Sequence, residues 1–206
     1  DINATGIEGL DAIVIGSVSL SHQPSRSAIE RAVRIAFEEG VAVCFDVNIR
    51  PTIWPGREAV WAVCEPILQA STLVKMSMDD AKFLFDLGSN PTPEQIVARL
   101  RPYVTDFVVI TDGARGAWFS NGDFDGHSPP VFVPAFRVDA KEPTGAGDAF
   151  VAAIIARLIA IDWDLLTVED VRYASAAGAL TTTREGAIDS LPTGAEIQEF
   201  LAAQTS

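Results

Sequence analysis

Cysteine and histidine are scarce in this sequence. Its 206 residues include two cysteines, Cys44 and Cys64, and two histidines. The cysteines lie in apolar segments, too few and too far apart for a metal cluster, which favours a reducing compartment. The histidines lack the spacing of metal ligands. We therefore expect neither a disulfide framework nor a metal cluster.

Basic residues and long apolar runs are also few. Lysine and arginine number 15 against 28 acidic residues, and the net charge of −13 argues against nucleic acid or an anionic membrane as partner. No apolar run is long enough to span a membrane, and the N-terminus does not resemble a signal peptide. A cytoplasmic protein is the resulting expectation. An anionic ligand would need a locally positive site, such as a helix N-terminus or a bound metal ion.

Apolar residues are present in a regular order. They make up 48% of the chain, which suits one domain, 1–206, with a sizeable core. Short apolar runs alternate with segments of helical spacing, which predicts an α/β fold with a mostly parallel sheet. A hairpin-like pair within 106–120 adds an antiparallel edge, and 121–130 is a polar loop. We expect strands at 12–16, 41–47, 72–75, 106–111, 116–120 and 131–136, and helices at 25–39, 57–70, 78–87, 93–100, 146–161, 168–183 and 194–204.

The stretch 142–150 has the composition of an anion site. Gly145, Ala146 and Gly147 precede a long apolar run that is typical of a buried helix, so they fall at its first turn. Helix N-terminal N–H groups lack intrahelical partners, and small side chains allow a phosphate to approach them. Asp148 would then be a carboxylate able to deprotonate an attacking hydroxyl. The alternative is an ordinary helix start with Asp148 as its cap.

Polar residues follow two of the predicted strands. Asp46, Asn48 and Arg50 alternate at the carboxyl end of a strand, where open parallel sheets bind ligands. They are predicted either to point into one cleft or to form a structural Asp46–Arg50 ion pair. Ser77 and Asp80 begin the helix after the next strand. They serve either phosphate and metal binding or simple helix capping.

Several of these segments resemble the ribokinase/PfkB family of carbohydrate kinases. Thr-Gly-Ala-Gly-Asp-Ala-Phe, 144–150, is similar to the family's second motif. Asp-x-Asn-x-Arg-Pro-x-x-Trp, 46–54, looks like the fructokinase and 2-keto-3-deoxygluconate kinase branch. The resemblance implies a ribokinase-like, three-layer α/β/α fold and transfer of the γ-phosphoryl group of ATP to a sugar. It also implies Mg²⁺ as a cofactor and K⁺ as a further one.

The resemblance assigns roles to individual positions. Asp148 is implied as the catalytic base and Gly145 to Gly147 as the anion hole. Asp46, Asn48 and Arg50 are implied to bind the substrate, with Arg50 near the phosphates as well. Ser77 and Asp80 occupy the places of the family's Asn-x-x-Glu, which is tied to magnesium and phosphate. The nucleotide positions are Thr111, Gly113, Gly116, Ala177 and Gly178. Two of them, Gly113 and Gly116, also suit a plain hairpin turn, and small residues such as Gly178 also suit helix packing. The monovalent-cation positions are Glu142, Thr144, Thr181, Arg184, Gly186 and Ser190.

The sequence departs from the family in two places. Glu142-Pro143 stands where the family has Asp-Thr, which puts the geometry of the cation site in question. No segment like the family's N-terminal Gly-Gly segment and β lid precedes Asp1, so we expect a fragment or a shortened protein, with apolar sheet edges that a partner or a homodimer would cover. Fructose is the expected acceptor. The alternatives are 2-keto-3-deoxygluconate, an inactive nucleotide-binding relative and a nucleotide hydrolase.

Overall fold

A computed structural model describes residues 2–103, 105–122 and 128–204. The chain divides into two compact units, an N-terminal unit of residues 1–111 and 119–130 and a C-terminal unit of residues 112–118 and 131–206. Six strands pair in sequence order, β1 to β6. Within the described residues, no helix has the length and apolar character that crossing a membrane requires.

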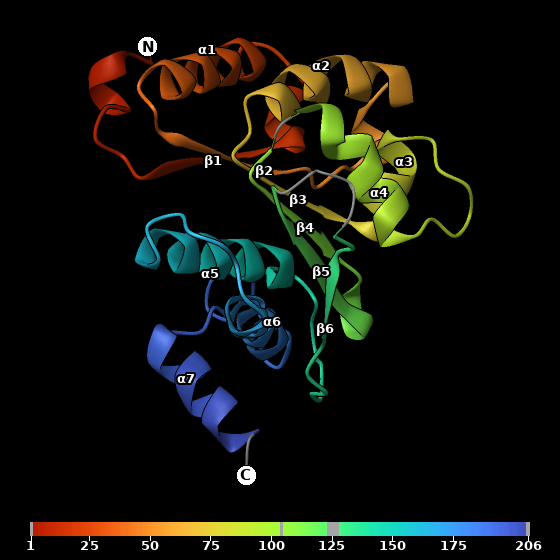
Figure 1. The fold of residues 1–206 in the computed structure, drawn as a ribbon, viewed down its shortest axis with the longest axis vertical. Helices are drawn as coiled ribbons and strands as arrows, with labels where there is room; N and C mark the ends of the chain where they lie inside the picture. The colour runs from red at the N-terminus through yellow and green to blue at the C-terminus, as the bar shows by residue number, and fades with distance from the viewer. Residues whose placement is uncertain (1, 104, 123–127, 205–206) are drawn as a thin grey trace. The chain divides into compact units, whose positions relative to one another are not determined.

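The N-terminal unit contains the parallel part of the sheet. Its strands are β1 (Ala12–Gly16), β2 (Ala42–Asp46), β3 (Leu73–Ser77) and β4 (Phe107–Thr111). Each pairs in parallel with the next, and the register places Asp46 opposite both Gly16 and Lys75, and Ser77 opposite Thr111. The carboxyl ends of the four strands therefore share one edge, as parallel pairing requires. Figure 1 shows these strands running side by side.

Local sequence signals explain the helices of this unit: α1 (Ser25–Glu38), α2 (Arg57–Gln69), α3 (Met78–Leu84) and α4 (Pro93–Leu100). Thr92 and Gln95 form a capping box at the start of α4, with Pro93 in the first turn. The predicted α3 is three residues too long, because Asp86 adopts a φ of 52° just beyond its C-cap. The other predicted helices and strands are confirmed to within two residues at each end.

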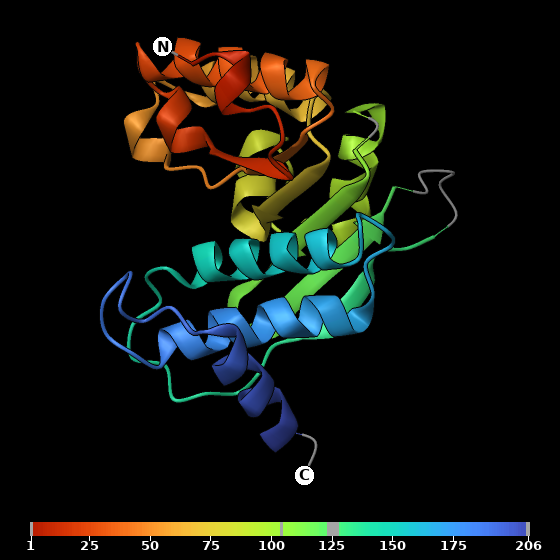
Figure 2. The ribbon, with the colours of Figure 1, turned by 90° about the vertical axis from the view of Figure 1, so that its left-hand side faces the viewer.

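The C-terminal unit is dominated by two long helices. Besides part of β5 (Gly116–Asn121) and β6 (Val131–Pro134), it contains α5 (Ala146–Ala160), α6 (Val168–Thr182) and α7 (Gly194–Ala203). Helices α5 and α6 lie alongside each other (Figure 2), and Arg157 of α5 pairs with the buried Asp170 of α6 at 2.7 Å. Residues 123–127 of the predicted polar loop lie outside the described residues.

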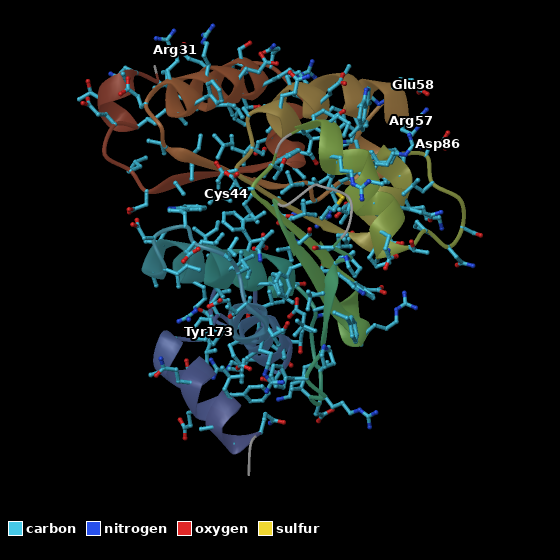
Figure 3. All side chains as sticks on the ribbon, in the orientation of Figure 1. Arg31, Cys44, Arg57, Glu58, Asp86 and Tyr173 are labelled. Atoms are coloured by element: carbon cyan, nitrogen blue, oxygen red, sulfur yellow. The ribbon has the colours of Figure 1, made fainter. Side chains whose placement is uncertain are left out.

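The two cysteines are buried and free. Burial raises the pKa of both thiols to about 12, and the Asp80 charge adds to the effect at Cys64. Cys44 lies on β2 within the N-terminal unit (Figure 3). Thiols of this kind are poor nucleophiles and poor metal ligands. Among the described residues, no group of three or more histidines, cysteines and acids is placed to hold a metal ion.

Candidate active site

The start of α5 has the geometry expected of an anion site. Gly145 is the N-cap, with φ 81° and ψ −9°, and no side chain caps the helix. Asp148 is therefore not the cap but the third residue of the helix, and its side chain is exposed. The alternative of Asp148 as a cap is wrong. Ala146 N–H already donates to the Pro143 carbonyl at 3.2 Å, so an anion would have to compete for that donor.

Glycine is required at position 145 for two reasons. Its φ of 81° lies in the left-handed region, and a Cβ there would come within 3.0 Å of the Ala187 carbonyl oxygen. Helix α5 consequently begins directly against the chain around residue 187.

We expect Gly145→Ala to destabilise the protein beyond the cost of its backbone conformation. Gly9→Ala is the matched control, because Gly9 has the same φ of 81° with nothing within 4 Å of the added Cβ. A left-handed alanine costs about 1–2 kcal/mol, which both variants incur, and only Gly145→Ala adds the steric contact. Urea unfolding measures the difference, and equal losses for the two variants would show that the Ala187 contact relaxes without cost.

The residues predicted for a monovalent cation are gathered beside this helix start. The backbone N–H groups of Lys141 and Glu142 donate to the Thr182 carbonyl at 2.7 and 3.1 Å. The Gly186 N–H donates to Glu142 Oε2 at 3.0 Å. That bond and one with the Thr144 side chain lower the pKa of Glu142. Ser190 is fully buried and donates to the Ala187 carbonyl at 3.3 Å. Glu142 thus ties the segment before α5 to the loop after α6.

The Arg184 side chain has a separate role in the C-terminal unit. Its Nη2 pairs with Glu196 Oε1 of α7 at 2.5 Å, while Glu196 also accepts from the backbone and hydroxyl of Thr193. The Thr193 backbone bond is the largest cause of the lowered pKa of Glu196, about 2, followed by the bond from Arg184. The Arg184 side chain is thus occupied by its ion pair with Glu196, and the predicted cation role depends on the Arg184 backbone carbonyl.

Glu196→Gln is expected to lower the thermal midpoint at pH 7 by weakening the α7 cap. The folded pKa of about 2 lies below the ordinary glutamate pKa of 4.5, so the stabilisation is complete above about pH 4.5 and is lost as pH falls towards 2. The difference in midpoint between wild type and variant should therefore shrink over that range. Glu199→Gln, on the exposed side of the same helix, is the control. A difference independent of pH would contradict the assignment.

Gly178 and Ala177 serve helix packing. A Cβ on Gly178 would lie 3.1 Å from the Ala146 carbonyl oxygen and 3.8 Å from Phe150 Cβ, and Ala177 is 2% exposed. The packing interpretation is therefore confirmed for Gly178, which allows α6 to approach the first turn of α5 closely.

The turn 46–50 after β2 is fixed at several points. Asp46 is 6% exposed and accepts from Lys75 Nζ at 3.0 Å, so the predicted Asp46–Arg50 ion pair is wrong. Asn48 adopts a φ of 36°, and its side-chain oxygen accepts from Arg50 Nη1 at 2.6 Å. Arg50 is exposed and Asn48 is half-buried. The expectation of three side chains in one cleft thus fails for Asp46, which is buried in an ion pair.

Asp80 is part of a capping box at the start of α3. Its Oδ2 accepts from the Ser77 backbone and hydroxyl at 2.9 and 2.7 Å, and its N–H donates to Ser77 Oγ at 3.0 Å. Its Oδ1 accepts from the Ile49 N–H at 2.7 Å. The capping interpretation is confirmed. The two carboxylate oxygens accept three bonds from the protein and Asp80 is 9% exposed, which favours a contact through water over a direct bond to a metal ion.

The segment after β4 contains both exposed residues and a buried glycine that backbone packing requires. Gly113 is exposed with φ 51°, and Thr111 is half-buried at the strand end. Gly116 is buried with φ 136°, and a Cβ there would overlap the Val133 carbonyl oxygen. Gly116 is thus required by close backbone packing beside β6, which the prediction of a nucleotide contact did not include.

Sequence reasoning assigned no role to two residues that shape this region. Lys75 is the buried partner of Asp46, and Ser17, which is fully buried, donates to the Asn48 carbonyl at 3.2 Å. A lysine within the apolar strand 73–77 was a signal for the first. No sequence pattern connects Ser17 with Asn48, because that contact depends on how the strands pair.

The whole chain resembles known sugar kinases. It matches the model of the pfkB family carbohydrate kinase over residues 4–194. Fructokinase-1 of Zea mays is 34% identical and Fructokinase-1 of Oryza sativa subsp. japonica 32% identical, each over 205 residues. These alignments cover 98% of this chain and 61% of the relatives, so the chain spans about three fifths of their length.

Solved structures agree with the sequence matches. Fructokinase from Vibrio cholerae O395, in its fructose, ADP and calcium ion bound form, superposes with a TM-score of 0.83 at 30% identity, covering 97% of this chain and 64% of that one. Aminoimidazole riboside kinase from Salmonella enterica, complexed with aminoimidazole riboside and an ATP analog, has a TM-score of 0.79 at 26% identity, with coverage of 94% and 63%. The fold is therefore ribokinase-like.

Proposed function

Because this chain belongs to the pfkB family of carbohydrate kinases, we propose that it transfers the γ-phosphoryl group of ATP to a hydroxyl of fructose. The observation that carries the proposal is the start of α5. There an exposed carboxylate, Asp148, stands on a first turn whose cap, Gly145, has no side chain. That arrangement leaves a proton acceptor beside a region of positive helix potential.

Each part of this helix start has a task in the reaction. The Asp148 carboxylate takes the proton of the acceptor hydroxyl as the oxygen attacks phosphorus. Gly145 and Gly147 place backbone N–H groups and the helix dipole where charge develops on the phosphoryl oxygens, and the Ala146 N–H joins them by exchanging the Pro143 carbonyl for the anion. Thr111 and Gly113 are proposed to contact the nucleotide. Gly116, Ala177 and Gly178 contribute through packing.

Fructose is favoured by the relatives and by the turn 46–50. The Vibrio cholerae fructokinase structure holds fructose and ADP, and the curated relatives above are fructokinases. Arg50 and Asn48 are the proposed sugar contacts, with hydroxyls accepting from the guanidinium group. The alternative acceptor, 2-keto-3-deoxygluconate, would use the Arg50 charge for its carboxylate. Phosphorylation of the keto acid should therefore depend on the positive charge at position 50 more strongly than phosphorylation of the ketose.

Two metal ions belong to the proposal. Magnesium would accompany the ATP phosphates, without a direct ligand from Asp80. Potassium, which a Vibrio cholerae fructokinase double mutant holds in its solved structure, would be bound by the Glu142–Ser190 region. There Glu142, Thr144, Ser190 and the carbonyls of Thr181, Arg184 and Gly186 offer the oxygen-rich set that a hard cation prefers. A cytoplasmic location and a homodimer complete the proposal.

The test is a coupled assay for ADP with magnesium, ATP and a sugar panel. We expect ADP release that requires fructose. ADP release without added sugar would indicate a nucleotide hydrolase, and release only with 2-keto-3-deoxygluconate would move the assignment to the keto-acid branch. ATP binding without turnover on any acceptor would identify an inactive relative.

A further inference from the structure

The acid at position 80 bonds to the turn 46–50 in a way that its capping role does not require. A capping box is complete with the reciprocal Ser77 and Asp80 bonds. In addition, Asp80 Oδ1 accepts from the backbone N–H of Ile49, 31 residues earlier, at 2.7 Å in a buried setting. A buried backbone N–H needs an acceptor, and here a carboxylate with 9% exposure supplies it.

The bonded amide lies between the two proposed sugar contacts. Ile49 separates Asn48 from Arg50, and Arg50 Nη1 donates both to Asn48 Oδ1 at 2.6 Å and to the Ile49 carbonyl at 3.2 Å. The guanidinium group is therefore held by one bond to the Asn48 side chain and one bond to the Ile49 carbonyl. Asn48 is held with φ 36°, a conformation that non-glycine residues rarely adopt.

Further bonds fix the same turn from β3 and from the segment that follows β1. The Val47 N–H donates to the Lys75 carbonyl at 2.9 Å, and Ser17 Oγ donates to the Asn48 carbonyl at 3.2 Å. Neither of these bonds involves the Ile49 N–H. The Asp80 bond holds that group, so the turn is bonded to the rest of the unit at Val47, Asn48 and Ile49 without a ligand.

We propose that Asp80 is a positioning residue that holds the turn 46–50, and with it Arg50, in the conformation that meets the acceptor. The inference rests on the proposed function for the identity of the acceptor, but the bond to Ile49 can be measured independently. A positioning role differs from a metal or phosphate role in its effect. Loss of the positioning bond weakens sugar affinity, whereas loss of a metal or phosphate contact weakens nucleotide affinity.

Three variants in the full chain separate these roles. Asp80→Glu keeps an acid able to complete a capping box with Ser77, but its longer side chain no longer matches the Ile49 N–H. Asp80→Asn has a single acceptor oxygen, which cannot serve Ser77 and Ile49 together. Asp79→Asn is the matched control, because Asp79 is exposed in the same first turn and its loss changes the same charge at the helix start.

In steady-state kinetics, Asp80→Glu and Asp80→Asn are expected to lower kcat/KM for fructose by about 10- to 100-fold, because a misplaced contact group costs that much. The KM for Mg-ATP should change by less than about two-fold. Asp79→Asn should match wild type in both constants. An Asp80→Glu enzyme with unchanged sugar KM and altered Mg-ATP KM would overturn the proposal in favour of a nucleotide-side role.

Hydrogen exchange of the Ile49 amide, followed by NMR, tests the bond without turnover. We expect Asp80→Asn to accelerate this exchange, while amides in the core of β2 stay protected and Asp79→Asn leaves Ile49 unchanged. Unaltered Ile49 exchange in Asp80→Asn would overturn the positioning role even if the kinase activity is present. Wild type could lack sugar-dependent turnover while Asp80→Asn still accelerates Ile49 exchange. That result would contradict the proposed function but support the bond by which Asp80 fixes the turn 46–50.

Discussion

Asp148→Asn is expected to lower kcat for fructose phosphorylation by about 10²- to 10⁴-fold, the usual contribution of a general base. Asparagine has nearly the same shape but cannot accept the hydroxyl proton. Since Asp148 is exposed and caps nothing, its replacement should leave the free energy of unfolding within about 0.5 kcal/mol of wild type. Coupled ADP assays and urea unfolding measure the two quantities.

The control is Asp162→Asn at the other end of the same helix. Asp162 is exposed and has a φ of 52°, which asparagine tolerates, so both stability and kcat should be retained. Binding of Mg-ATP to Asp148→Asn, measured by calorimetry, should stay near the wild-type affinity because the backbone of the first turn is intact. Full turnover in Asp148→Asn would remove the carboxylate from the mechanism, and loss of folding would make it structural.

Lys75→Met should produce the largest loss of stability among the variants considered. The ammonium and carboxylate of the Lys75–Asp46 pair are 3.0 Å apart, with side chains 7% and 8% exposed. Removing the lysine leaves the buried Asp46 carboxylate without this cation, and breaking such a pair costs about 3–5 kcal/mol. Urea unfolding at neutral pH measures the loss.

A double variant distinguishes a broken ion pair from poor packing. Lys75→Met combined with Asp46→Leu removes both charges, and we expect it to recover most of the stability, because apolar replacement of a buried pair is often neutral or better. The exposed Lys82→Met on α3 is the control and should change the free energy of unfolding by less than about 0.5 kcal/mol. A Lys75→Met loss below about 1 kcal/mol would indicate that water or another group of the protein compensates the Asp46 charge.

The sequence determined the order of helices and strands and the start of α5. Helical and strand periodicity, the Thr92 and Ser77 caps and the Gly-Ala-Gly-Asp stretch all act through neighbouring residues. The family resemblance at 144–150 was readable for the same reason, since it lies within one short segment.

Only the tertiary structure decided which groups meet across the sheet and between loops. Asp46 pairs with Lys75, 29 residues away, and Asp80 reaches Ile49, 31 residues away, because parallel strands bring their carboxyl ends to one edge in a register that no local pattern specifies. Gly116 likewise owes its identity to the Val133 carbonyl rather than to a turn. The sequence alone thus determined which side chains are available, and strand pairing determined which of them remain free to meet a ligand.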